Sequence, residues 1–276
     1  IRLPVSGKRW FGQEKGQDDD GAAYRALVDQ CVLACSSRSV HLILDLHHYR
    51  APKDLDVAFW KDAAIRYKDN PAVLFGLLNE PHNIRWEVWR NGGEVTDKKR
   101  VTDAANENAE VLTTFTTVGM QGLIDAVRET GAKNIVLVGG LDWAYDLSGV
   151  LKGFGCSDPT GNGIIYDTHV YPWKSKWQES FLDVAAIHPV LLGEVGCDIA
   201  RMSFIPPERH EDPYTWAPDM LACIQKHRLH WTAWSFHPGA TPRILASNKD
   251  FAPTPWWGAF VRAALRGATW QSDKLR

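Results

Sequence analysis

The chain has 276 residues, a formal net charge of −2 and a hydrophobic content of 45%. That length and composition allow one large α/β domain with a full core. The near-neutral charge and the lack of a long basic run argue against nucleic acid and anionic membrane surfaces as partners. No apolar stretch approaches the roughly 18 residues that a spanning helix needs, so we expect no membrane span.

Runs rich in Val, Ile and Leu alternate along the chain with longer segments of helical character. The expected strands are 1–5, 40–46, 73–78, 134–138, 163–170, 189–193 and 230–235. The expected helices are 20–35, 57–67, 106–130, 178–186, 214–227 and 255–265. Near-continuous apolar strands that alternate with helices are typical of a parallel sheet covered on both faces, so the pattern predicts an α/β fold.

The number of strands constrains the architecture. Seven strands are one fewer than a (β/α)₈ barrel requires, so either one strand is missing or the sheet is open. Because Ile1 already lies inside a strand, we infer that the first strand–helix element of a barrel precedes the numbered chain. No internal linker or low-complexity tract interrupts the pattern, which indicates a single domain over residues 1–276, incomplete at its start.

Two long loops and the cysteines indicate less about the fold and the function. The loop 82–103 contains the charge run 98–100, which we expect to be a solvated face, and the segment 201–216 has the character of an irregular rim loop. Five cysteines leave at least one thiol unpaired if disulfides form. Cys31 and Cys35, four apart on a predicted helix, favour buried apolar positions, and the sequence contains no zinc-type cluster.

Polar, titratable or aromatic side chains lie at or near the ends of the predicted strands. In barrels the active site lies at the carboxyl ends of the strands, so these side chains are candidates for one site. Two of them, Glu80 and Glu194, end short apolar runs, and an ionised glutamate is rarely buried without a partner. A convergent pair of carboxylates is what hydrolysis of a glycosidic bond requires.

Tryptophan is unusually abundant, with 13 in the chain. We expect about half of these rings to fill the core. Those in polar neighbourhoods or after strand ends are candidates for stacking on sugars, because flat rings offer a large, stiff contact surface. These candidates are Trp86, Trp89, Trp143, Trp173 and Trp177.

The strand-end residues resemble the active-site pattern of glycoside hydrolase family 5, a family of retaining (β/α)₈-barrel glycosidases. That pattern has an Arg on strand two, Asp-x-His on strand three, Asn-Glu-Pro on strand four, His-x-Tyr on strand six, Glu on strand seven and Trp on strand eight. The corresponding residues here are Arg2, His47, Asn79-Glu80-Pro81, His169, Tyr171, Glu194 and Trp234. The resemblance covers almost the whole chain and departs from the family only at the front, where the first strand and helix are absent.

The resemblance implies a role for each of these residues. Glu80 is the expected general acid/base and Glu194 the expected nucleophile. Arg2 and Tyr171 would keep Glu194 ionised through charge-assisted hydrogen bonds. The remaining expected roles are those of Asn79 (holding the sugar 2-hydroxyl), His169 (orienting Glu80), His47 (contacting the sugar) and Trp234 (the floor beneath it).

The adjacent histidines bear on a metal-dependent alternative. Neighbouring residues of a strand face opposite ways, so His47 faces the site and His48 points elsewhere. A metal-dependent hydrolase would need two rings facing one ion, which this pair cannot present. We therefore expect no metal and no other cofactor.

The predicted function is that of a retaining endo-β-1,4-glucanase, a cellulase that cleaves β-glucan by double displacement. The preference for β-1,4-glucan depends on the similarity of segments 139–147 and 169–173 to cellulase-like members of the family. Two alternatives stay open: a β-mannanase or other β-glycanase of the same family, and a carbohydrate-binding protein on a degenerate barrel. We expect a polysaccharide or oligosaccharide as the partner of a monomeric chain. The expected location is secreted or periplasmic, although residues 1–5 show no signal peptide.

Overall fold

The computed structural model describes the fold of residues 1–103 and 106–276, and the side chains of residues 1–97 and 112–276. The chain forms two compact units, which are described separately below. The first contains Ile1–Ala144 and Gly149–Ile165, and the second contains Tyr145–Ser148 and Tyr166–Arg276. The single domain expected from the sequence stays a prediction.

Four parallel strands form the core of the first unit. In spatial order they are β1 (Arg2–Val5), β2 (Leu42–Leu46), β4 (Val73–Gly76) and β8 (Val136–Gly139). Every residue of β2 is buried, as expected for a central strand covered on both faces. A second, short parallel pair, β3 (Tyr49–Arg50) and β5 (Glu80–Pro81), follows β2 and β4 in the chain and brings Tyr49 opposite Glu80.

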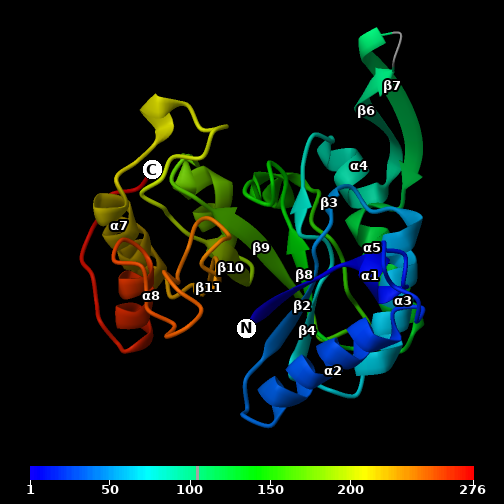
Figure 1. The fold of residues 1–276 in the computed structure, drawn as a ribbon, viewed down its shortest axis with the longest axis horizontal. Helices are drawn as coiled ribbons and strands as arrows, with labels where there is room; N and C mark the ends of the chain where they lie inside the picture. The colour runs from blue at the N-terminus through cyan, green and yellow to red at the C-terminus, as the bar shows by residue number, and fades with distance from the viewer. Residues whose placement is uncertain (104–105) are drawn as a thin grey trace. The chain divides into compact units, whose positions relative to one another are not determined.

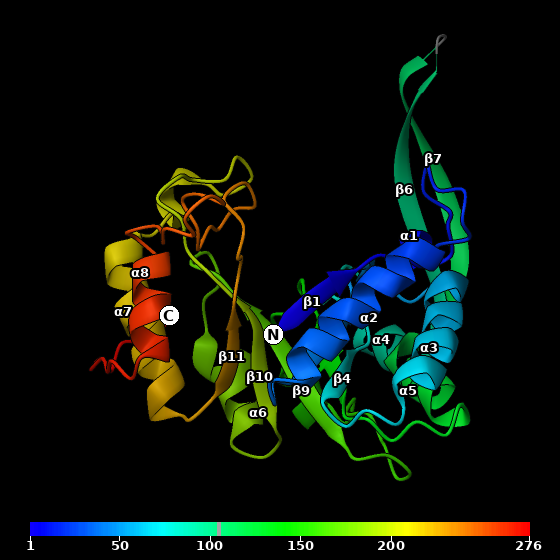
Figure 2. The ribbon, with the colours of Figure 1, turned by 60° about the horizontal axis from the view of Figure 1, so that its bottom comes forward.

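Helices connect these strands and supply the aromatic part of the core. They are α1 (Gly7–Trp10), α2 (Ala22–Ser36), α3 (Asp54–Tyr67), α4 (Trp86–Asn91) and α5 (Gly119–Glu129). Helices α3 and α5 lie side by side (Figures 1 and 2). The buried rings of Trp10, Phe59, Trp60 and Phe75 contact one another in sequence, at centroid distances of 5.0–5.2 Å. Two of the tryptophans therefore fill the core, as expected for part of the set.

An antiparallel hairpin replaces the first half of the predicted helix 106–130. Its strands are β6 (Gly93–Asp103) and β7 (Asn106–Thr117), and only from Gly119 onward is the chain helical. The β-branched threonines of segment 113–117 favour a strand over a helix, which accounts for the wrong prediction. Figure 1 shows the hairpin extending away from α4. The charge run 98–100 falls where side chains are not described.

The second unit has three parallel strands. The central strand β10 (Val190–Val195) pairs on one side with β9 (Ile164–Val170), whose first two residues belong to the other unit, and on the opposite side with β11 (His230–Ala233). Its helical segments are a π-helical turn (Gln178–Leu182), α6 (Asp183–Ala185), α7 (Pro213–Lys226) and α8 (Gly258–Leu265). Short 3₁₀ turns occur at Ser148–Lys152 and Pro207–Arg209. Asp212 caps α7 by accepting a hydrogen bond from the Tyr214 amide, and Pro213 occupies the first helical position.

The strand–helix alternation confirms the predicted α/β class. Each of the seven predicted strands is present, and the strands pair in parallel. The sequence did not predict α1, α4 or the hairpin. Within the described residues, no helix combines the length and apolar character needed to cross a bilayer.

Candidate functional site

A buried ion-pair network joins the start of β1 to the carboxyl-terminal ends of β2 and β4. Arg2 Nη2 donates to Asn79 Oδ1 at 2.6 Å and lies 3.0 Å from Asp45 Oδ1. The second oxygen of Asp45 lies 2.8 Å from His47 Nδ1. Because a buried carboxylate is costly without partners, the pairing of Asp45 with both Arg2 and His47 is what makes its burial tolerable. The network also fixes the rotation of the Asn79 amide.

Asp45 is a site residue that the sequence did not single out. The signal was present, since Asp45 is the first residue of the Asp-x-His pattern that identified His47. The expected support of Glu194 by Arg2 stays a prediction.

The two adjacent histidines face different partners, as predicted. His47 Nε2 lies 3.2 Å from the Tyr49 hydroxyl, so both nitrogens of its ring are in contact with polar groups. His48 Nδ1 instead lies 2.8 Å from Asp56 Oδ2, in the first turn of α3. His47 therefore belongs to the candidate site, and His48 ties the end of β2 to a helix.

Glu80 lies on β5, in a segment whose backbone is held by the neighbouring strand end. The Glu80 amide donates to the His48 carbonyl at 3.3 Å, and the Asn79 amide donates to the Leu46 carbonyl at 3.0 Å. His82 Nδ1 lies 2.9 Å from the Glu80 carbonyl oxygen. Glu80 itself is half-buried, which suits a group that must exchange protons with a ligand.

Trp143 is presented by a strained turn beside this segment. Asp142, Trp143 and Ala144 have φ values of 55°, 59° and 59°, a region that residues other than glycine rarely adopt. The Trp143 amide donates to the Pro81 carbonyl at 3.0 Å, and the indole stacks on His82 at 4.5 Å with an interplanar angle of 8°. Trp143 is 42% exposed. Strain of this kind clusters at functional sites, and an exposed indole in this segment suits a sugar platform.

In the second unit, Glu194 is buried on β10, and Tyr171 and His169 face its carboxylate. The Tyr171 hydroxyl donates to Glu194 Oε2 at 2.5 Å. His169 Nδ1 lies 3.6 Å from the same oxygen, and His169 Nε2 lies 3.6 Å from Asp167 Oδ2. The predicted Tyr171–Glu194 hydrogen bond is confirmed. The expected orientation of Glu80 by His169 stays a prediction.

A β-bulge at Gly193 sets the direction of Glu194. Leu192 pairs with Thr168 and Glu194 pairs with His169, so two steps along β10 match one step along β9. The Gly193 amide donates to Asp167 Oδ1 at 2.8 Å, and a Cβ atom at Gly193 would lie only 2.2 Å from that oxygen. Bulges re-aim side chains next to active sites, and here only glycine fits against the carboxylate. Neither Gly193 nor Asp167 was predicted; a glycine inside an apolar strand was the available signal.

Trp234 and Trp173 contact residues that adjoin Glu194 or bond to it. The Trp234 amide donates to the Val195 carbonyl at 2.9 Å, which fixes Trp234 beside the residue that follows Glu194. Trp173 stacks on Tyr171 at 4.8 Å with an interplanar angle of 2°, and Phe204 meets Trp173 edge-on at 5.6 Å. Both tryptophans are half-buried and remain candidates for sugar contact.

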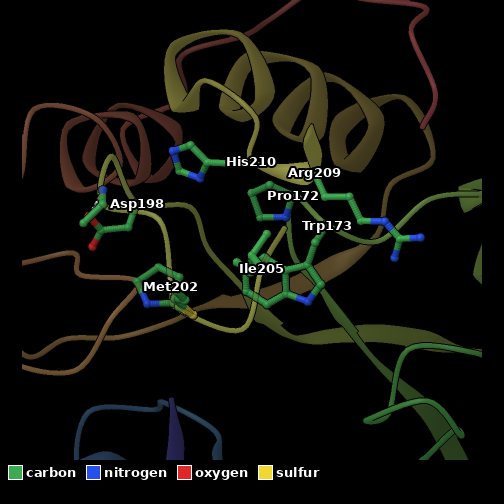
Figure 3. A pocket seen from close by; sticks show the side chains of 9 residues that line it. Pro172, Trp173, Asp198, Met202, Ile205, Arg209 and His210 are labelled. Atoms are coloured by element: carbon green, nitrogen blue, oxygen red, sulfur yellow. Dashed lines mark hydrogen bonds between the residues drawn. The ribbon is translucent and has the colours of Figure 1, made fainter. Parts of the chain in front are cut away.

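The rim segment 201–216 helps to line a shallow hollow beside Trp173 (Figure 3). Apolar groups from Pro172, Trp173, Met202 and Ile205 make up much of its lining. Figure 3 shows the Arg209 guanidinium extending away from these groups. The segment therefore forms part of the wall of this hollow.

Two predicted sugar platforms are packed into the protein. Trp89 and Trp177 are only 1% and 0% exposed, and their indole N–H groups donate to the carbonyls of Gly139 and Lys174. Rings buried in this way present no broad face to a ligand, so the structure does not support the predicted sugar contacts of Trp89 and Trp177. Trp86 is half-buried; it packs edge-on against Trp89 at 4.8 Å and lies so close to Gly149 that a Cβ there would clash with its ring. Its sugar contact stays a prediction.

Comparison with known proteins gives this geometry a context. A model of the cellulase family, glycosyl hydrolase family 5, matches residues 1–240. An endoglucanase of Paenibacillus polymyxa is 23% identical over 291 residues, covering 87% of this chain but 66% of that protein, slightly less than two thirds of its length.

Solved structures show the same fold. A β-glucanase from Saccharophagus degradans, in complex with cellotetraose, superposes with a TM-score of 0.73 at 24% identity, covering 96% of this chain and 77% of the other. The structure of XacCel5A, in complex with cellopentaose, has a TM-score of 0.63 at 24% identity, covering 95% of this chain and 85% of the other. These similarities confirm the predicted fold class.

Proposed function

The chain belongs to the cellulase family, glycosyl hydrolase family 5, and we propose on that basis that it is a retaining endo-β-1,4-glucanase with Glu194 as nucleophile and Glu80 as acid/base. The observation that most strongly supports this proposal is the environment of Glu194. A buried carboxylate that accepts a 2.5 Å hydrogen bond from Tyr171, on a strand bulged at a glycine, is held in one orientation at some cost to folding.

The proposed reaction has two steps. Glu80, protonated, donates its proton to the glycosidic oxygen while Glu194 attacks the anomeric carbon, so the bond to the leaving sugar breaks and a glycosyl–enzyme ester forms. Glu80, now ionised, then takes a proton from water, which attacks the anomeric carbon and releases Glu194. Two inversions at one carbon give net retention.

Several residues support these steps in the proposal. His47 and Asn79, both held by Arg2 and Asp45, supply polar groups for the sugar hydroxyls. Trp143 and Trp234 supply aromatic surface for the sugar faces. The complexes of related structures with cellotetraose and cellopentaose favour β-1,4-glucan as the substrate class. Because such polymers do not enter cells, we also propose that the protein acts outside the cytoplasm.

Parallel product analysis on carboxymethylcellulose, mannan, xyloglucan and laminarin tests the substrate class. We expect cello-oligosaccharides from carboxymethylcellulose, with the β-anomer appearing first in a proton NMR time course. Preferential cleavage of mannan would favour the β-mannanase alternative. An α-anomer as first product would contradict the retaining mechanism.

Substitution of the two glutamates tests the assignment of roles. Glu80→Gln and Glu194→Gln are each expected to lower kcat by about 10²-fold or more, with unchanged circular dichroism. Glu87→Gln, an exposed glutamate on α4, is the matched control and should retain full activity. Near wild-type activity in either glutamine variant would overturn the roles, and wild-type glucan binding without turnover would favour the binding-protein alternative.

A further inference from the structure

Two exposed phenylalanines stack on each other in the loop that follows β11. Phe236 and Phe251 are 68% and 60% exposed, and their rings lie 5.9 Å apart with an interplanar angle of 12°. Contiguous exposed apolar surface on a soluble protein marks an interaction site more often than isolated apolar residues do. The sequence analysis gave neither residue a role.

The loop that carries these rings is closed by backbone hydrogen bonds. The Ser235 amide donates to the Pro242 carbonyl at 2.7 Å, and the Ala246 amide donates to the Ala252 carbonyl at 2.8 Å. The first bond closes segment 235–242, which contains Phe236, and the second closes segment 246–252, which contains Phe251. The rings are therefore held by an ordered loop.

An ion pair with one buried partner fixes the same loop to the body of the second unit. Arg243 donates to both oxygens of the buried Asp198, at 2.9 and 3.0 Å, and its guanidinium lies over the Trp256 ring at 5.2 Å. Bidentate pairs of this kind add geometric specificity as well as energy. A surface that is ordered before a ligand arrives loses less entropy on binding.

The backbone at Phe251 adopts a strained conformation. Its φ of 54° lies in the left-handed region, which is unfavourable for a bulky side chain. Asp250 Oδ1 accepts a hydrogen bond from the Ala252 amide at 3.2 Å and so supports the turn on both sides of the ring. Because the side chain it presents is exposed, burial of Phe251 does not offset the strain.

The loop begins at the candidate site. Trp234, bonded to the carbonyl of Val195, directly precedes it, and Phe236 follows two residues later. We propose that Phe236 and Phe251 form a remote subsite that stacks a glucosyl residue of the same polymer, beyond the residues next to the cleaved bond. This inference rests on the proposed function and adds a specific binding position to it.

The size and surroundings of the pair favour a sugar chain as its occupant. Two phenylalanine rings bury at most about 500 Å², less than the roughly 800 Å² per partner of a stable protein interface. Three exposed polar residues close to them in the sequence, His237, Asn248 and Lys249, offer hydrogen-bonding groups to a ligand. An apolar platform with a polar rim matches the apolar face and peripheral hydroxyls of a β-linked glucan.

Chain length is the variable that distinguishes a remote subsite. In a Glu194→Gln background, which prevents turnover, we would measure the dissociation constants of cellotriose and cellohexaose by calorimetry. The double variant Phe236→Ala/Phe251→Ala is expected to weaken cellohexaose binding about tenfold, or 1.4 kcal/mol, and to leave cellotriose binding unchanged. In the active enzyme the same change should raise KM for carboxymethylcellulose and leave kcat unaltered.

Three further variants control for loss of exposed apolar surface and for the ring itself. Ile187→Ala and Leu265→Ala remove side chains that are 68% and 77% exposed, and neither should change the length dependence. Phe236→Tyr keeps an aromatic face and should bind cellohexaose as the parent does.

Three results would overturn the inference. Unchanged cellohexaose binding in the double variant would leave the rings without a role in binding, and equal weakening of cellotriose and cellohexaose would indicate a displaced catalytic centre. A wild-type dimer that the double variant converts to monomer, with glucan binding intact, would identify a self-association surface. In each case wild-type hydrolysis of β-glucan would leave the proposed function standing, whereas a wild-type protein that neither binds nor cleaves any β-glucan would overturn both.

Discussion

Tyr171 holds Glu194 and Trp173 at once. Its hydroxyl donates to Glu194 Oε2 at 2.5 Å, and its ring stacks on Trp173 with an interplanar angle of 2°. The stack restricts the tyrosine ring, so the hydroxyl reaches the carboxylate from a fixed direction. A carboxylate that must attack a carbon atom benefits from a donor that fixes its orientation without moving in the reaction.

Tyr171→Phe removes that donor and keeps the stacked ring. A hydrogen bond to a charged group contributes about 1.5–3 kcal/mol, so we expect kcat on β-glucan to fall by about 10- to 150-fold. Steady-state kinetics with near-ultraviolet circular dichroism would check both rate and fold. Tyr67→Phe is the matched control, because its buried hydroxyl also donates to a carboxylate, that of Asp29 at 2.8 Å. Equal loss of activity in both variants would mean that Tyr171 acts only through stability.

Gly193 is predicted to tolerate no side chain. A Cβ there would lie 2.2 Å from Asp167 Oδ1, and the bulge that aims Glu194 would have to shift. Overpacking of this kind costs about 1–3 kcal/mol, so Gly193→Ala should lower Tm by several degrees and reduce kcat strongly. Thermal unfolding and kinetics of the same sample would check this. Gly7→Ala, whose added Cβ would approach no atom closer than 3.6 Å, should do neither.

Sequence reasoning reached the polar strand ends because parallel strands deliver their last residues to one edge of a sheet. That rule identified Glu80 and Glu194 without a structure, and the family resemblance implied the Tyr171 contact. It could not predict the bulge at Gly193, because a register shift depends on how β10 pairs with β9 and not on the sequence of either strand alone. Asp167 was not predicted for the same reason, because its role is to accept a hydrogen bond from Gly193 on the neighbouring strand.

The wrong predictions have local causes. In segment 106–117 we expected a helix, yet its threonine-rich second half pairs with β6, where β-branched side chains fit a pleated surface. Trp89 and Trp177 have polar sequence neighbours, but each indole N–H reaches a backbone carbonyl and so tolerates full burial. Burial of a tryptophan depends on an acceptor distant in sequence or hidden in a loop, which neighbouring residue types do not reveal.

The adjacent histidines offer a test of position within one dipeptide. His47 contacts Asp45 and Tyr49 in the candidate site, whereas His48 pairs with Asp56 of α3. His47→Ala is expected to reduce kcat/KM by about tenfold or more, because it removes a polar contact to the sugar. His48→Ala should lower Tm and leave kcat/KM within about twofold. The reverse pattern would place His48 in the site.

Metal removal provides an independent test of the carboxylate mechanism. Double displacement by two glutamates needs no Lewis acid, and His47 and His48 are directed at separate carboxylates. Activity on carboxymethylcellulose should therefore be the same before and after dialysis against a chelator. Loss of activity that returns on addition of a divalent cation would contradict the mechanism.

The pair Arg128–Asp158 is predicted to make the first unit acid-sensitive. Arg128 donates to both oxygens of Asp158 at 2.8 Å, and the side chains are 8% and 2% exposed. The hydrogen bonds from Arg128 hold the pKa of Asp158 below its usual value, together with backbone hydrogen bonds from Gly163 and Gly161. A lowered folded-state pKa means that the unfolded chain binds the proton more readily, so the stabilisation is present above the unfolded pKa of about 3.9 and is lost as pH falls through the folded pKa.

Asp158→Asn removes this dependence. At pH 7 the variant should lose about 3 kcal/mol in free energy of unfolding, because Arg128 is left buried without its counter-charge. Below about pH 4 the difference from wild type should shrink, since the unfolded wild-type chain then binds a proton at Asp158 while the folded chain still holds that carboxylate ionised. Urea denaturation at pH 7 and pH 3 measures both values. Glu129→Gln, which breaks the exposed pair with Lys61, should change the free energy of unfolding at neither pH. An equal loss of stability at both pH values in Asp158→Asn would show that Arg128 requires the shape of Asp158 and not its charge.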